Sequence, residues 1–202
     1  MKKLLVLLSL FGLSVAAWSQ TLDSPDGNLK LTFGLSAEKT PVYSLQYKDK
    51  DVVKESKMGF ILKPSLDFSK NFSVVDTEFS ESESTWNPVL GQYREIEDKH
   101  KEMLVELKQE KTGWLLNIRF RLFDDGLGFR YEFPVQNNLR HFTLVEELTE
   151  FCLSGDHKAF WIPADYDTNE FPISTSKLSE VAGLIDKVRE EPLAATPSMR
   201  SH

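Results

Sequence analysis

The chain has 202 residues, with 24 Lys and Arg against 31 Asp and Glu, so its formal net charge is −7. Because nucleic-acid binding and docking on anionic lipid both need a basic surface, this balance argues against either function. The hydrophobic fraction of 41% and the charged fraction of 27% are typical of a globular protein, and the length allows one large domain or two small ones.

The first residues read as an export signal. Lys2 and Lys3 are followed by an apolar stretch over residues 4–15, which is too short for a membrane-spanning helix. Ala17-Trp18-Ser19 has the small-x-small pattern of a cleavage site, which predicts a signal peptide over residues 1–19. We therefore expect a periplasmic or secreted product without a membrane span after cleavage. The alternative is an uncleaved anchor, because a tryptophan beside the cleavage site is unusual.

From residue 20 onwards, the chain reads as short strands separated by turns. Apolar and polar residues alternate over residues 29–35 and 43–47, with shorter apolar runs at 58–62 and 72–79. The clearest pattern covers residues 114–133. Trp114, Leu116, Ile118, Phe120 and Leu122 share one face, whereas Asn117, Arg119 and Arg121 share the other. A second alternating run at 129–133 follows the Asp/Gly-rich residues 124–128, so the segment predicts a β-hairpin.

Further strands are expected at 103–107, 142–145 and 159–162, and one helix at 176–188. The helix is indicated by apolar residues at helical spacing, and Ser176 is its candidate N-cap. Residues 191–202 show no periodicity and are expected to form an irregular tail. Many short antiparallel strands with turn signals favour a mainly β fold, an antiparallel sandwich with one short C-terminal helix.

Common catalytic motifs are absent from the sequence. It contains no Walker loop, no His-Glu-x-x-His and no Gly-x-Ser-x-Gly. The single cysteine, Cys152, cannot form an internal disulfide, and its apolar neighbours indicate a small buried hydrophobic residue. The four histidines are scattered and are expected at the surface.

Two loops could bind a ligand. The first, residues 86–96, combines Trp86, a proline and a glycine with mixed charges. It suits a surface on which a sugar ring stacks, but the favoured interpretation is a plug in which Trp86 covers one end of the sandwich. The second follows the apolar run that ends at Pro163 and carries Asp165, Asp167 and Glu170. Crowded carboxylates suit Ca²⁺, although the spacing is not that of an EF-hand, and a solvated acidic loop is the simpler interpretation.

Several stretches resemble glycoside hydrolase family 97, in particular the N-terminal domain of its exported bacterial α-glucosidases and α-galactosidases. The resemblance runs from about residue 22 to about residue 188. It is carried by the hairpin string 119–133, by both loops, and by the shorter stretches 22–29 and 176–180. It implies a domain over residues 20–190 that forms an antiparallel β-super-sandwich, which in the family precedes a (β/α)₈ barrel with the catalytic carboxylates.

The resemblance also implies a metal role. In the Ca²⁺-dependent members, a glutamate of this domain ligates the catalytic Ca²⁺ beside glutamates of the barrel, and the matching residue is Glu170. Calcium is therefore expected only in the intact enzyme, because one glutamate supplies one or two of the six to eight oxygens that Ca²⁺ takes. The resemblance assigns no catalytic and no cofactor-binding residue to this chain. Oligosaccharide and the catalytic barrel are the expected partners.

Two functions follow as hypotheses. In the first, the chain is a truncated or frame-shifted product with an incomplete sandwich, because residues 197–202 leave the family pattern and no barrel follows. It would then be the carbohydrate-associated N-terminal domain of an α-glycosidase acting on α-linked oligosaccharides, inactive alone. In the alternative, it is a free-standing exported carbohydrate-binding module that uses Trp86, Trp161 and Tyr166 with the acidic loop.

Overall fold

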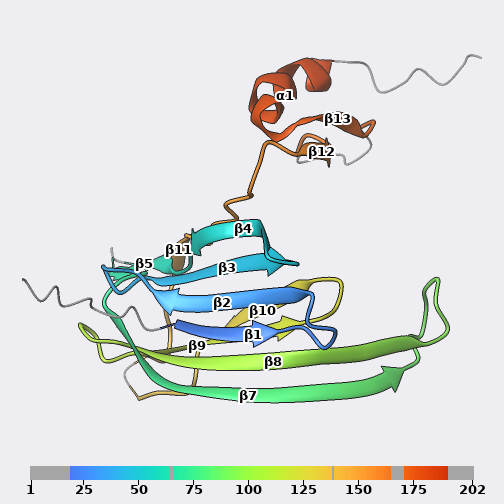
Figure 1. The fold of residues 1–202 in the computed structure, drawn as a ribbon. Coiled ribbons are helices and arrows are strands. Elements are labelled where there is room, and N and C mark those ends of the chain that lie inside the picture. The colour runs from blue at the N-terminus through green and yellow to red at the C-terminus, as the bar shows by residue number, and fades with distance from the viewer. Residues whose placement is uncertain (1–18, 64–65, 138, 165–170, 191–202) are drawn as a thin grey trace, which may run out of the picture. The chain divides into compact units, whose positions relative to one another are not determined.

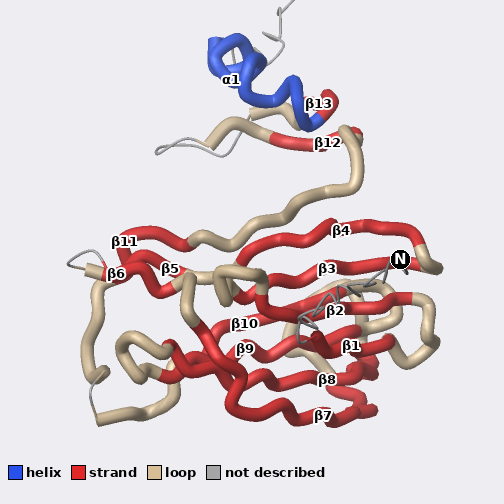
Figure 2. Tube along the Cα trace, turned by 60° about the vertical axis from the view of Figure 1, so that its left-hand side comes forward, coloured by secondary structure: helices blue, strands red, loops and turns tan. Residues whose placement is uncertain are grey.

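The computed structural model describes residues 19–63, 66–137, 139–164 and 171–190. They form two compact units, a sheet unit that ends at Cys152 and a hairpin–helix unit that begins at Leu153. Figures 1 and 2 show the elements. The sheet unit contains β1 (Ser19–Asp23), β2 (Leu29–Leu35), β3 (Pro41–Tyr47), β4 (Lys50–Lys57), β5 (Phe60–Leu62), β6 (Leu66–Phe68), β7 (Phe72–Trp86), β8 (Ile96–Gln109), β9 (Leu115–Leu122), β10 (Leu127–Glu132) and β11 (Leu144–Glu147). The second unit contains β12 (Lys158–Trp161), β13 (Ser174–Lys177), the 3₁₀ helix η1 (Leu178–Glu180) and α1 (Val181–Glu190).

Two four-stranded antiparallel sheets form the sheet unit, one in the order β1-β2-β3-β4 and the other in the order β10-β9-β8-β7. Buried side chains of both sheets form one core cluster, so the two sheets pack face to face. A small sheet, β11-β5-β6, lies beside them. This arrangement confirms the predicted mainly β, antiparallel sandwich-like fold, and the described residues form no closed barrel.

The core lies between the two large sheets, where alternation along each strand directs every second side chain inward. Leu31 and Phe33 of β2 meet Ile118 and Phe120 of β9, and all four side chains are fully buried. The rings of Phe33 and Phe120 have centroids 5.6 Å apart. Because consecutive residues point to opposite faces, Arg119 and Arg121 must project from the outer face of the same sheet.

The turn between β1 and β2 is held by Asp26. Its carboxylate accepts hydrogen bonds from the Ser24 hydroxyl at 2.6 Å and from the Asn28 backbone at 2.9 Å, and these bonds lower the pKa of Asp26 to about 2. The Asp26 backbone N–H in turn donates to Asp124 Oδ1 at 2.8 Å, in the loop between β9 and β10. This contact joins the two large sheets at one end of the sandwich.

The long hairpin β7–β8 extends beyond the rest of its sheet, as Figure 1 shows. β9 pairs with β8 only between Lys101 and Lys108, whereas β7 pairs with β8 as far as the pair Trp86 and Ile96. Residues 82–86 and 96–100 therefore pair only with one another, and we call them the arm. Burying few side chains, the arm adds little to the core.

The hairpin–helix unit is an antiparallel pair, β12 and β13, followed by η1 and α1. Trp161 Nε1 donates to Ser176 Oγ at 3.0 Å across the pair. Asp156 accepts the backbone N–H and the hydroxyl of Ser179, each at 2.9 Å, at the start of η1. In the described part of the chain, no helix has the length and apolar character needed to cross a membrane.

The predicted helix at 176–188 is right in type but wrong at its start. Residues 176 and 177 belong to β13, a 3₁₀ turn follows, and the α-helix begins at Val181. Ser176 is not a cap, because its hydroxyl is bonded to Trp161 and to the Lys177 carbonyl. The Glu180 carboxylate instead accepts the Lys177 backbone N–H at 2.9 Å. Hydroxyl-rich β13 lacks the apolar alternation from which a strand is predicted.

Candidate functional site

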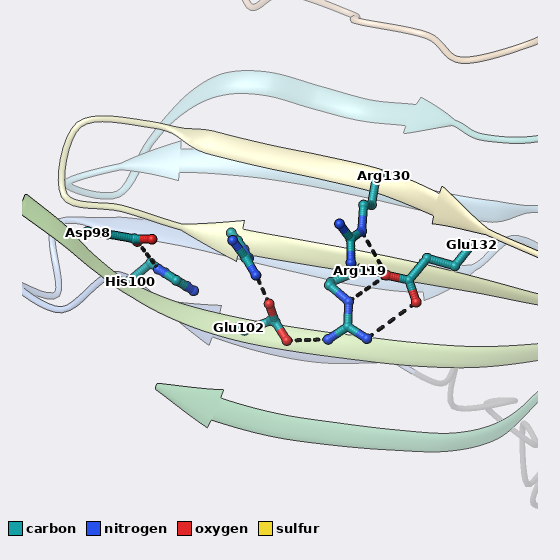
Figure 3. Close-up of polar contacts among 7 residues, drawn as sticks. Asp98, His100, Glu102, Arg119, Arg130 and Glu132 are labelled. Atoms are coloured by element: carbon teal, nitrogen blue, oxygen red, sulfur yellow. Dashed lines mark hydrogen bonds and ion pairs between the residues drawn. The ribbon is translucent and has the colours of Figure 1, made fainter. Parts of the chain in front are cut away.

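A network of glutamate and arginine side chains covers part of the outer face of the sheet β10-β9-β8-β7 (Figure 3). Glu102 of β8 is directly opposite Arg121 of β9, and Arg121 Nε donates to Glu102 Oε2 at 2.8 Å. Arg119 lies between the two carboxylates. It contacts Glu102 through Nη1 and donates from Nε to Glu132 Oε1 at 2.6 Å. Arg130 of β10 also donates to Glu132, from Nε at 2.7 Å. The network joins three adjacent strands.

Partial burial and the hydrogen bonds within the network shift the pKa values of its members. Glu102 is only 12% exposed at its side chain, and Arg119 is 22% exposed. Burial alone would raise the pKa of Glu102, but hydrogen bonds from Arg121 and Arg119 outweigh it and hold the pKa below its usual value. The Arg119 hydrogen bond likewise lowers the pKa of Glu132, and the same bond raises the pKa of Arg119. Glu102, Glu132 and Arg119 therefore remain charged at neutral pH.

These pKa directions predict an acid-sensitive contribution to stability. A carboxyl whose folded-state pKa is lowered stabilises the fold above its ordinary pKa, near 4.5 for glutamate, and loses this effect as the pH falls through the folded-state value. Glu102→Gln is expected to lower the free energy of unfolding by about 1–3 kcal/mol at pH 7. The difference between wild type and variant should shrink as the pH falls below 4.5. Urea unfolding between pH 3 and pH 7 measures both quantities.

The matched control is Glu83→Gln. Glu83 forms an ion pair with Lys99 at 3.5 Å, but its side chain is 69% exposed. Solvent screens such a pair, so its removal should leave stability nearly unchanged at every pH. An equal loss in both variants would show that the Glu102 network has no special role.

The predicted calcium ligand Glu170, with Asp165 and Asp167, lies outside the described residues. The strand expected before this loop is present as β12, and β13 follows the loop. The pair β12–β13 holds both ends of the segment, and Arg189 Nη2 of α1 donates to the Ala164 carbonyl at 2.7 Å, just before the acidic residues. Among the described residues there is no group of three His, Cys, Asp or Glu side chains placed to hold a metal ion.

The other predicted loop, residues 86–96, is at the end of the arm. Trp86 is the last residue of β7 and is 50% exposed, so the interpretation of Trp86 as a plug over the sandwich is wrong. Tyr93, in the connecting segment, is 70% exposed. The plug interpretation failed because the sequence does not reveal how far β7 and β8 continue past β9. The exposed rings leave the sugar-stacking interpretation open as a hypothesis.

A hollow of about 630 Å³ in the sheet unit is bordered by residues of both charges, among them Glu38, Lys57, Lys70 and Glu150. Lys70 Nζ lies 3.1 Å from Glu38, and Lys57 Nζ lies 4.0 Å from Glu150. Its charges thus pair locally rather than converge on a common point. The hollow is therefore a weaker candidate than the arginine network.

Two expectations about single residues are wrong. His100 is 4% exposed rather than at the surface, because its Nδ1 is 2.5 Å from Asp98 Oδ1 and its ring packs on Phe123 with centroids 5.1 Å apart. Cys152 is exposed rather than buried. The segment that contains it lies along β4, where the Cys152 backbone N–H donates to Ser56 Oγ at 2.9 Å and the side chain is directed outward.

Comparison with known proteins identifies the family of this chain. A family model described as Glycosyl-hydrolase 97 N-terminal matches residues 22–200. The chain belongs to this family. The resemblance found in the sequence is thereby confirmed. Within the family 97 domain, the string 119–133 that carries the resemblance covers most of the β9–β10 hairpin, which supplies all three arginines and one of the two glutamates of the network.

The similar proteins are longer enzymes. A retaining alpha-galactosidase from Bacteroides thetaiotaomicron is 26% identical over 162 residues, which make up 79% of this chain and 23% of the relative. A family 97 glycoside hydrolase from Pseudoalteromonas sp., solved in complex with panose, is 34% identical with a TM-score of 0.72, covering 78% of this chain and 24% of that chain. A beta-arabinopyranosidase at 22% identity and a TM-score of 0.67 shares the fold. The chain thus spans about a quarter of the length of its relatives.

Sequence reasoning missed the arginine network of this family 97 domain. The alternation placed Arg119 and Arg121 on the polar face of a strand, which is correct. It did not show that Glu102, which precedes them by seventeen residues or more, is their partner. Pairing of β8 with β9 brings them together. Three arginines occur within one hairpin, and once the pairing of β8, β9 and β10 is known, two glutamates lie beside them. This combination is the signal from which the network could have been inferred.

Proposed function

We propose that the chain acts as the carbohydrate-associated N-terminal domain of an exported, Ca²⁺-dependent α-glycosidase that hydrolyses α-linked oligosaccharides. The family match over residues 22–200 carries this proposal. It is supported by the relatives, one of which is an alpha-galactosidase and another of which was solved with panose. Export rests on the signal-peptide pattern of residues 1–19, which directs the protein to the periplasm or the medium.

Catalysis is assigned to the part of the relatives that this chain does not match. The chain corresponds to 23–24% of their length. The arginine network offers hydrogen-bond donors, but its two glutamates are each bonded to arginines and lie on a sheet face rather than on either side of a cleft. We therefore propose that the domain supports substrate binding and the architecture of the enzyme, and that the reacting carboxylates lie in the catalytic barrel.

Glu170 is the proposed contribution of this domain to a calcium site. Carboxylate oxygens are the ligands that Ca²⁺ prefers, so the donor chemistry of Asp165, Asp167 and Glu170 fits the ion. The described strands on either side of this segment, β12 and β13, pair with one another. A bound ion would supply a fixed positive charge beside the substrate. The remaining oxygens would come from the barrel.

The purified chain is expected to release no p-nitrophenol from α-glucosides or α-galactosides, with or without added Ca²⁺. Calorimetric titration should also detect no Ca²⁺ binding below millimolar concentration, because a single glutamate provides too few oxygens. Glu170→Gln is the matched variant and should behave identically. Hydrolysis by the wild-type chain would overturn the assignment of catalysis to the barrel. Tight Ca²⁺ binding that Glu170→Gln abolishes would show that this chain holds the whole metal site.

The exposed rings of Trp86 and Tyr93 favour a second candidate, a free-standing carbohydrate-binding module. Both rings lie on the arm or its connecting segment, where a sugar face could stack. Titration with maltooligosaccharides while tryptophan fluorescence is recorded separates the candidates. A saturable change that Trp86→Ala removes would favour the module, whereas an unchanged spectrum would favour the enzyme domain.

A further inference from the structure

A gap in the outer face of β9 and β10 lies next to the arginine network. In the antiparallel register, Gly128 of β10 is directly opposite Arg121 of β9, and Arg130 is opposite Arg119. Gly128 has no side chain, and a Cβ built at this position would meet nothing within 4 Å. The result is a hollow of about 190 Å³ whose lining includes Arg121, Phe123, Gly128 and Arg130. We call these four residues the Gly128 niche.

Two arginines of the niche, Arg121 and Arg130, have N–H groups that bond to no other side chain of the network. Three guanidinium groups face two carboxylates, so the network carries one excess positive charge in a chain of net charge −7. Arg119 engages Nε and both Nη atoms. Arg121, by contrast, is bonded only through Nε, and Arg130 through Nε and Nη2. Within the described part of the chain, both Nη groups of Arg121 and Nη1 of Arg130 have no partner.

Unsatisfied guanidinium groups on two sides of a hollow suit an oxyanion. A planar guanidinium matches a carboxylate with two parallel N–H···O bonds, and such charge-assisted bonds are among the strongest in proteins. The diagonal placement of Arg121 and Arg130 across adjacent strands separates them by about 7–8 Å between Cα atoms, which leaves room for one small group between the side chains. Phe123 adds an apolar wall.

We propose that the Gly128 niche binds a carboxylate group, held between the free Nη atoms of Arg121 and Arg130. The carbon skeleton that bears the carboxylate lies against Phe123. The carboxylate can belong to an acidic sugar such as a uronate, or to an acidic side chain of a polypeptide. The proposal does not depend on whether the chain belongs to a calcium enzyme.

The experiment records the arginine Nε–Hε signals of the ¹⁵N-labelled chain by NMR during titration with glucuronate. The matched neutral probe is glucose, and propionate represents the carboxylate of a glutamate side chain. Glucuronate is expected to shift the Arg121 and Arg130 signals saturably in the millimolar range, while glucose leaves them unchanged. Added NaCl should weaken the response, because the contact is electrostatic and partly exposed.

Two variants test the location. Gly128→Val fills the niche without removing a charge, and a β-branched residue suits a strand. Arg121→Gln removes the most available donors. Each should reduce glucuronate affinity at least fivefold, whereas Lys30→Gln, which removes a positive charge from the exposed position 30 on β2, should leave it unchanged.

The outcomes distinguish an acidic sugar from an acidic side chain as the source of the carboxylate, and they also test whether the niche binds a carboxylate at all. Tighter binding of glucuronate than of propionate assigns the site to acidic sugars, and equal binding shows that a carboxylate alone, as on an acidic side chain, is sufficient. An equal response to glucose, or a glucuronate response that both variants leave intact, would overturn the proposal. So would the absence of any shift at high millimolar glucuronate in a chain whose spectrum shows it to be folded.

Discussion

Replacing Phe120 by alanine is expected to lower the free energy of unfolding of the sheet unit by about 3–5 kcal/mol. The side chain is fully buried between the two large sheets. Its ring centroid lies 5.6 Å from that of Phe33, 6.5 Å from that of Tyr43 and 5.9 Å from that of Phe129. Truncation would leave a cavity that residues from three strands cannot close without losing their own contacts. Because the free energy of unfolding of a domain is only about 5–15 kcal/mol, this loss is a large part of the total stability.

Chemical unfolding followed by far-UV circular dichroism measures this effect. Phe79→Ala is the control, since Phe79 lies on β7 of the same sheet but is 51% exposed. Its removal should change the free energy of unfolding by less than about 1 kcal/mol. If both variants lost the same stability, the interface between the two sheets would not be the main core of the unit.

Gly59→Ala is the second substitution for which we expect a large effect, a loss of about 2–5 kcal/mol. Gly59 has a φ of 145°, a conformation that side chains other than glycine rarely adopt. A Cβ at this position would lie 2.5 Å from Cβ and 2.6 Å from Cα of Ser69. The Gly59 carbonyl also accepts the Leu148 N–H at 2.8 Å, so a shift of this backbone would disturb the segment that follows β11.

Two other glycines calibrate the result by the same unfolding measurement. Gly27 has a φ of 74° but open space around it, so Gly27→Ala reports the backbone cost alone, about 1 kcal/mol. Gly126 has neither a positive φ nor a close neighbour, and Gly126→Ala should be nearly silent. A Gly59 variant no less stable than the Gly27 variant would rule out the close approach to Ser69.

Strands with one apolar face were predicted from the sequence with good accuracy. β2 matches the expected residues 29–35, and the hairpin β9–β10 was placed correctly, because alternation is strong where one face packs on the core. β4 was missed because only Val53 and Ser56 of its eight residues are buried. It is an edge strand, paired with β3 alone among the described strands, so it has little apolar surface to bury.

The candidate site was less predictable than the fold. The sequence showed that Arg119 and Arg121 share a polar face, but the network also needs Glu102, and the niche needs Gly128 opposite Arg121. Both depend on strand register, which long-range packing determines. The buried state of His100 was missed for a similar reason, since the ring of Phe123, which packs on it, comes from the segment after β9. Local patterns do not encode such neighbours.

The arm formed by residues 82–86 and 96–100 has a consequence for how the sequence can change. Within the described structure, most of its side chains are exposed, and its backbone pairs only with itself. Apart from the buried His100, positions in the arm meet almost no requirement beyond strand propensity, whereas a change in β2 or β9 must satisfy a close-packed interior. The arm is therefore the part of the sheet unit that can acquire new surface chemistry most freely, with the fold left undisturbed.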